Sequence, residues 1–148
     1  MRSSRQWIPF GGLVATIAVA WFAVVHLHGQ TAPADLTNAV TAEVRDAQGQ
    51  VLLQGPFMAV DEDDDDVERR AVLQAAGADA DAAGEAEVEI ARTGATKQEV
   101  EFSVRNLPPG TSLTFVIDGA DVATATTNQR GRAEVDIDVA MPGSTPAR

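Results

Sequence analysis

Cysteine and tyrosine are both absent from the 148 residues of this chain. The only histidines, His26 and His28, and both tryptophans lie in the first 34 residues. Without cysteine the chain has no disulfide framework, no thiol nucleophile and no cysteine for a lipid anchor. Residues 35–148 therefore lack the usual general base and activated nucleophiles of enzymes, and the ligands of ordinary zinc sites. We expect no enzymatic activity and no catalytic residue.

Basic residues are also scarce. Residues 35–148 contain nine Lys and Arg against 22 Asp and Glu, a formal charge of −13. Nucleic-acid binding requires clustered Lys and Arg to neutralise phosphates, so nucleic acid is excluded as a partner. The acidic balance leaves cations and basic proteins as candidate partners.

The first 34 residues have the composition of an export signal. Arg2 and Arg5 precede an apolar run, no acidic residue is present, and Ala32-Pro33-Ala34 fits an A-x-A cleavage site. The alternative is a retained N-terminal membrane anchor, because residues 7–27 are mostly apolar and a spanning helix needs about 20 residues. Both alternatives place the remainder outside the cytoplasm, as a periplasmic, secreted or anchored protein.

Alternation of apolar and charged residues predicts antiparallel strands in the second half of the chain. In Glu85–Ile90 every second side chain is a glutamate, and residues 99–139 continue the pattern. Asp118-Gly119 predicts a tight hairpin between two of these strands. The expected strands are residues 39–45, 50–58, 67–74, 85–90, 99–105, 111–117, 122–127 and 132–139, with the last four forming a meander.

The predicted fold class is an all-β, antiparallel β-sandwich of seven to eight strands, preceded by one N-terminal hydrophobic helix. The expected domains are a signal peptide or anchor at residues 1–34, the sandwich at 35–140 and a flexible tail at 141–148. Two nearly identical strings, GEAEVEI at 84–90 and GRAEVDI at 131–137, fit two strands with the same apolar inner and acidic outer face.

The outer faces raise an electrostatic problem. If residues 85–91 pair with residues 99–105, Glu87 and Glu89 lie near Glu99 and Glu101, and directly opposed like charges destabilise a sheet. We expect the register to offset these carboxylates, with basic residues interleaved; a bridging cation is the alternative. The basic residues are Arg92, Lys97 and Arg105.

A run of acids at Asp61–Asp66 is the candidate metal site. Carboxylate oxygens suit Ca²⁺, and the candidate ligands are Asp61, Asp63, Asp64, Asp65, Asp66, Asp79 and Asp81. The spaced acids and central glycine of an EF-hand loop are missing, and consecutive acids on an extended chain point in alternating directions. The run therefore favours a solvated acidic loop, with Ca²⁺ binding as the alternative.

The string EVEFSVRNLPPGTSLTFVIDGADVATATTNQRGRAEVDIDV at residues 99–139 resembles exported bacterial β-proteins that carry an L-P-x-G-T corner followed by a V-D-G-type hairpin. The resemblance covers roughly residues 50–139 and implies an Ig-like or similar antiparallel sandwich. It carries no functional residue.

These observations predict an exported, non-enzymatic β-sandwich that serves as a structural or protein-interaction module of the cell envelope, with a protein partner. The alternative function is an acidic, Ca²⁺-binding extracytoplasmic module. An edge strand such as residues 50–58 is a candidate acceptor for a partner strand.

Overall fold

A computed structural model describes residues 35–60, 66–91 and 97–140 of the chain. The predicted leader or anchor with its hydrophobic helix, the acids Asp61–Asp65, and the predicted tail at 141–148 lie outside the described residues. The described residues contain no helix that is long and apolar enough to cross a membrane.

The described residues form an all-β, antiparallel sheet, as predicted. It has nine strands, because the short β3 adds one to the expected seven to eight. The strands are β1 Thr41–Asp46, β2 Val51–Pro56, β3 Met58–Ala59, β4 Asp66–Ala75, β5 Ala83–Ala91, β6 Lys97–Arg105, β7 Ser112–Ile117, β8 Ala120–Thr126 and β9 Ala133–Ala140.

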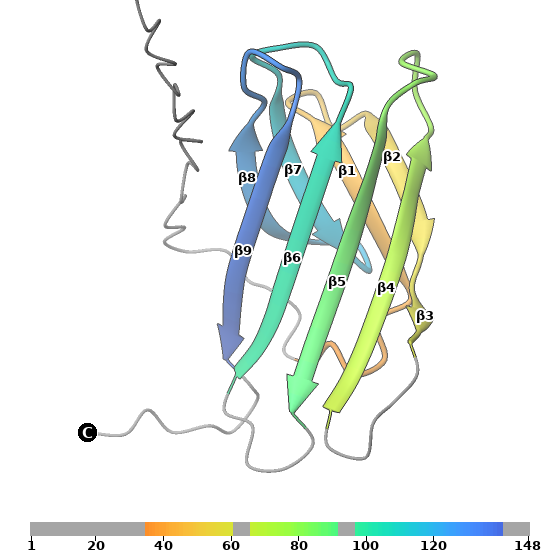
Figure 1. The fold of residues 1–148 in the computed structure, drawn as a ribbon, viewed down its shortest axis with the longest axis vertical. Helices are drawn as coiled ribbons and strands as arrows, with labels where there is room; N and C mark the ends of the chain where they lie inside the picture. The colour runs from red at the N-terminus through yellow and green to blue at the C-terminus, as the bar shows by residue number, and fades with distance from the viewer. Residues whose placement is uncertain (1–34, 61–65, 92–96, 141–148) are drawn as a thin grey trace, which may run out of the picture.

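The strand order is β8-β7-β1-β2-β4-β5-β6-β9, and β3 pairs with β4. Figure 1 shows that this sheet curls until it is nearly barrel-shaped, with β4, β5, β6 and β9 as one wall and β2, β1, β7 and β8 as the other. The walls join where β2 pairs with β4 through only two residue pairs, Leu53 with Ala75 and Gln54 with Gln74. The front wall, from β4 to β9, carries nearly all the alternating acidic residues.

The predicted meander over residues 99–139 is wrong, although all four of its strands form. β7 and β8 make the predicted hairpin, with positive φ at Asp118 and Gly119. However, β7 pairs with β1 and β9 pairs with β6, so the chain crosses from one wall to the other after β6 and again after β8. A tight turn holds two strands in one wall, whereas these longer connections span the gap between the walls.

The two crossing loops are packed against each other. Leu107 is buried, and its backbone N–H donates to the carbonyl of Gly131 at 3.1 Å. The hydroxyl of Thr127, also buried, donates to the carbonyl of Pro108 at 2.7 Å. Gly131 has φ of 69°, and a Cβ at this position would collide with the carbonyl oxygen of Leu107.

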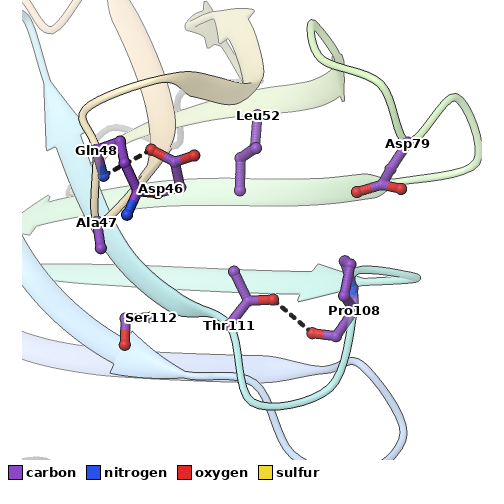
Figure 2. A pocket seen from close by; sticks show the side chains of 8 residues that line it. All are labelled: Asp46, Ala47, Gln48, Leu52, Asp79, Pro108, Thr111 and Ser112. Atoms are coloured by element: carbon purple, nitrogen blue, oxygen red, sulfur yellow. Dashed lines mark hydrogen bonds between the residues drawn. The ribbon is translucent and has the colours of Figure 1, made fainter.

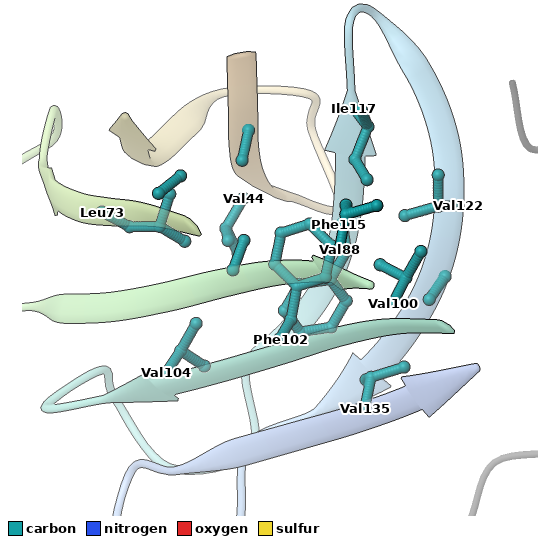
Figure 3. Packing of buried hydrophobic residues seen from close by; sticks show 14 of the residues in the cluster. Val44, Leu73, Val88, Val100, Phe102, Val104, Phe115, Ile117, Val122 and Val135 are labelled. Atoms are coloured by element: carbon teal, nitrogen blue, oxygen red, sulfur yellow. The ribbon is translucent and has the colours of Figure 1, made fainter. Parts of the chain in front are cut away.

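The core lies between the two walls (Figure 3). Phe102 from β6 and Phe115 from β7 are fully buried, with ring centroids 4.9 Å apart and planes tilted by 46°. The side chains of Val88, Val100 and Val135 point into the same space. The inner residues of the alternating strands therefore form the core, as the alternation indicates.

Residues 35–40 close one end of the sheet. Leu36 is buried and its backbone N–H donates to Oε1 of the fully buried Gln98 at 2.6 Å. The guanidinium of Arg69 donates to the carbonyl of Thr37 at 2.6 Å, and Asp118 accepts from the backbone N–H groups of residues 40 and 41. This end segment is tied to both walls before the chain enters β1.

We expect Gly131→Ala to destabilise the protein by about 2 kcal/mol or more, because the new Cβ meets a backbone oxygen and the residue needs positive φ. Gly110→Ala is the matched control, since Gly110 also has positive φ, 76°, but faces open space. Its expected cost is about 1 kcal/mol. Equal unfolding free energies of the two variants in urea titrations would show that the crossing loops do not depend on this contact.

Candidate functional site

The outer surface of β4, β5, β6 and β9 is strongly acidic. Alternation places their inner residues in the core and the intervening residues outside. We call this surface the acidic face, and its nine carboxylates belong to Glu68, Glu85, Glu87, Glu89, Glu99, Glu101, Glu134, Asp136 and Asp138. The repeated strings explain its symmetry, because β5 and β9 flank β6 and both pair with it antiparallel.

The predicted offset of the carboxylates is wrong. Glu87 lies directly opposite Glu101, which lies directly opposite Asp136 on its other side. The next row places Glu89 opposite Glu99, which faces Asp138. Like charges therefore stand in rows across three adjacent strands.

Core packing explains why the strands accept this register. The same register aligns Ala86, Phe102 and Val135 in one inner row, and Val88 with Val100 in the next. Burying one large apolar side chain stabilises the fold by about 1.5–3 kcal/mol, whereas a cross-strand charge pair changes stability by about 0.2–1 kcal/mol. A one-residue shift would also turn every inner side chain to the solvent. The apolar rows therefore decide the register, and the carboxylates follow.

Arg70 lies on β4, at the end of the row that continues through Glu87, Glu101 and Asp136. Its guanidinium lies 2.8 Å from Glu85 and 2.9 Å from Glu87, with Glu68 at 3.4 Å. The hydrogen bond and charge of Glu87, followed by the charge of Glu85, raise the pKa of Arg70. Its neighbour Arg69 instead points to the end segment and bonds the carbonyl of Thr37. The compensation by Arg70 is thus confined to the β4 side of the face.

Glu101 occupies the middle of the face, beyond these contacts of Arg70. Partial burial is the first cause that raises the pKa of Glu101, and the charges of Glu134, Glu87 and Asp136 raise it further. A small hollow of about 150 Å³ lies beside it, lined by Glu85, Glu87, Glu101 and Ser103. Glu101 therefore stands among carboxylates of both neighbouring strands, outside the ion pairs of Arg70.

The structure does not gather the candidate calcium ligands that it describes. Asp66 begins β4, whereas Asp79 and Asp81 follow its other end. A strand of ten residues spans about 30 Å, so these positions belong to opposite ends of the sheet. No group of three or more Asp, Glu, His or Cys within the described ranges is arranged to hold a metal ion. For Asp61, Asp63, Asp64 and Asp65, which are outside those ranges, Ca²⁺ binding stays a prediction.

A cleft of about 370 Å³ lies at the end of the sheet opposite the end segment (Figure 2). Its residues come from the end of β1 and the β1–β2 turn, from β2, from the β4–β5 loop, and from the β6–β7 loop and the start of β7. They are Asp46, Ala47, Gln48, Leu52, Asp79, Pro108, Thr111 and Ser112. Asp46 accepts the backbone N–H of Gln48 at 2.9 Å, and the hydroxyl of Thr111 donates to the Pro108 carbonyl at 2.7 Å. These polar groups stabilise the loops themselves. The arrangement is that of a surface cleft between turns.

Comparison of the chain with protein-family models, with curated proteins and with solved structures gave no match. The acidic face is therefore the feature of this molecule that bears on its function.

Sequence reasoning identified the outward carboxylates of β5 and β6 but missed their direct opposition and the role of Arg70. The repeated strings GEAEVEI and GRAEVDI are the sequence feature that could have predicted the opposition. They become β5 and β9, which flank β6 and align their outer carboxylates with those of β6 in rows. The pairing of β9 with β6 was the missing information.

Replacing Glu101 with Gln should stabilise the protein by roughly 0.5 kcal/mol at neutral pH, because it removes one member of a row of opposed like charges. In low-salt buffer this corresponds to a rise in melting temperature of about 2–4 °C for a domain of this size. Asp79→Asn, which removes the same charge from a loop, should change the unfolding free energy by less than about 0.5 kcal/mol.

The advantage of Glu101→Gln should depend on pH. A carboxyl whose pKa is raised on folding binds its proton more tightly in the folded state, so wild-type stability rises as pH falls through the folded pKa. The difference in melting temperature between the two proteins should be largest at pH 7–8 and shrink toward the ordinary pKa of 4.5. A difference that grows on acidification would contradict the assigned cause.

Proposed function

We propose that this protein is an exported, non-enzymatic module of the cell envelope that binds a basic protein partner through the acidic face. The carrying observation is the row Glu87–Glu101–Asp136, in which like charges are directly opposed. Core packing explains why the fold tolerates this row. A cationic ligand beside the row would be attracted by all three carboxylates and would reduce the repulsion among them. Partner binding would therefore be strongest where Arg70 does not reach.

The finer architecture also belongs to this proposal. We assign the sheet to the Ig-like sandwiches on the basis of its two walls and its connections that cross between them, both visible in Figure 1. Sandwiches of this kind present flat sheet faces and strand edges to partners, which suits an interaction module.

The non-enzymatic assignment has its support in composition. Residues 35–148 contain no histidine, cysteine or tyrosine, the residues that most often serve as general base or activated nucleophile.

Export is supported by the leader-like residues 1–34 and by the end segment. Leu36, two residues after Ala34, is already buried in the body. Cleavage after Ala34 would leave the contacts of Leu36 and Thr37 intact.

We expect the full chain to bind an unstructured Lys- and Arg-rich peptide with an affinity that falls steeply with salt, since exposed charges are screened within about 8 Å at physiological ionic strength. Fluorescence anisotropy is the measurement. The triple variant Glu87→Gln, Glu101→Gln, Asp136→Asn should bind at least several-fold more weakly.

The control variant is Asp79→Asn, Asp81→Asn, Asp121→Asn, which has the same net charge but alters exposed residues away from the face. It should bind like the wild type. Equal weakening of both variants would mean that only net charge matters, and the acidic face would lose its assignment.

Cell fractionation with N-terminal sequencing tests the location. We expect the protein outside the cytoplasm, beginning at Asp35 if the leader is cleaved or at the original N-terminus if it is retained. A cytoplasmic protein with an intact N-terminus would overturn the proposed export.

A further inference from the structure

β9 has a free edge in the described part of the chain. It pairs with β6 on one side, and it stands at one end of the strand order, with β8 at the other end. The two strands lie close together near the top of Figure 1 and separate toward the bottom, with no ladder between them. Unpaired N–H and C=O groups along such an edge form a template for another strand.

Two of the four inner side chains of β9 also lack full cover. Val135 and Val139 are buried, whereas Ile137 and Ala133 face inward and pack against the core but remain partly exposed. Their counterparts in β6, Val100 and Val104, have strands on both sides and are buried. An added strand with apolar inner residues would complete this cover.

The outer side chains of β9 determine which charge would suit a partner strand added beside it. Glu134, Asp136 and Asp138 are the last members of the rows that cross the acidic face. A strand added beside β9 would place its own outer residues next in these rows, one at every second position. Basic residues at these positions would be attracted by the carboxylates of Glu134 and Asp136, whereas acidic residues would extend the rows of like charge.

We infer that the free edge of β9 binds an extended segment of a basic partner, in which Lys or Arg alternates with apolar residues, by addition of a strand to the sheet. This inference rests on the proposed function and names the binding mode of the same surface. No ladder joins β9 to β8 in the described residues, so the outer edge of β9 is the edge with which such a strand would pair.

A second copy of this chain is a poor occupant of the same edge. Antiparallel pairing of β9 with another β9 would bring acidic outer residues opposite acidic outer residues. Charged edge residues are a known means of preventing such self-association. The charge that repels a second copy selects for a basic strand.

The test compares two peptides of equal composition with the full chain in low salt: an alternating peptide, Lys-Val-Lys-Val-Lys-Val-Lys, and a block peptide, in which the four lysines precede the three valines. We expect tighter binding of the alternating peptide and slower hydrogen exchange of β9 amides in its complex. Asp136→Lys should weaken binding about tenfold, because an attractive pair that becomes repulsive shifts the free energy by about 1.4 kcal/mol.

Glu89→Lys is the matched control, since Glu89 lies on the acidic face but two strands from the edge. It should reduce affinity less than Asp136→Lys does. Equal binding of both peptides without protection of β9 would overturn strand addition, while binding to the acidic face, and with it the proposed function, would stand. If neither peptide binds, both the strand addition and the proposed function are overturned. A dimer in sedimentation equilibrium that the alternating peptide does not dissociate would assign the edge to a second copy and overturn the inference.

Discussion

The alignment of apolar side chains across β5, β6 and β9 is the constraint on which the rest of this structure depends. Phe102 is at its centre, with Ala86 and Val135 opposite it in the neighbouring strands and the tilted ring of Phe115 packed against it from the other wall. Once these inner rows are aligned, every outer residue of the three strands has a defined neighbour. The strands have no further freedom to separate their charges.

The acidic face is the consequence of that alignment. Its rows of directly opposed carboxylates oppose folding, but by less than the buried rows favour it. Arg70 compensates the charge of Glu85 and Glu87 on one side, and the opposite side ends at the free edge of β9. The row that contains Glu101 and Asp136 therefore runs from Arg70 to the edge strand β9. This juxtaposition of opposed carboxylates with an edge strand is the reason for the binding that we propose at this wall.

Two features hold the walls in place relative to each other. At one end the crossing loops interlock through Leu107 and Gly131, and at the other the end segment is tied by Gln98 and Arg69. Each uses buried or partly buried hydrogen bonds to backbone groups, which suits a domain without disulfides. Among the described residues, the ladder that joins the two walls, between β2 and β4, contains only two residue pairs.

The sequence by itself determined the all-β class, most strands, the Asp118-Gly119 hairpin and the inner position of Phe102 and Phe115, because alternation and turn chemistry are local properties. Only the tertiary structure decided that β9 pairs with β6, that the chain crosses between walls after Arg105, and that Glu101 faces carboxylates on both sides. It also separated Asp66 from Asp79 by the length of β4. Pairing partners and register depend on contacts between residues distant in sequence, and a pattern that repeats every two residues fits several of them equally well.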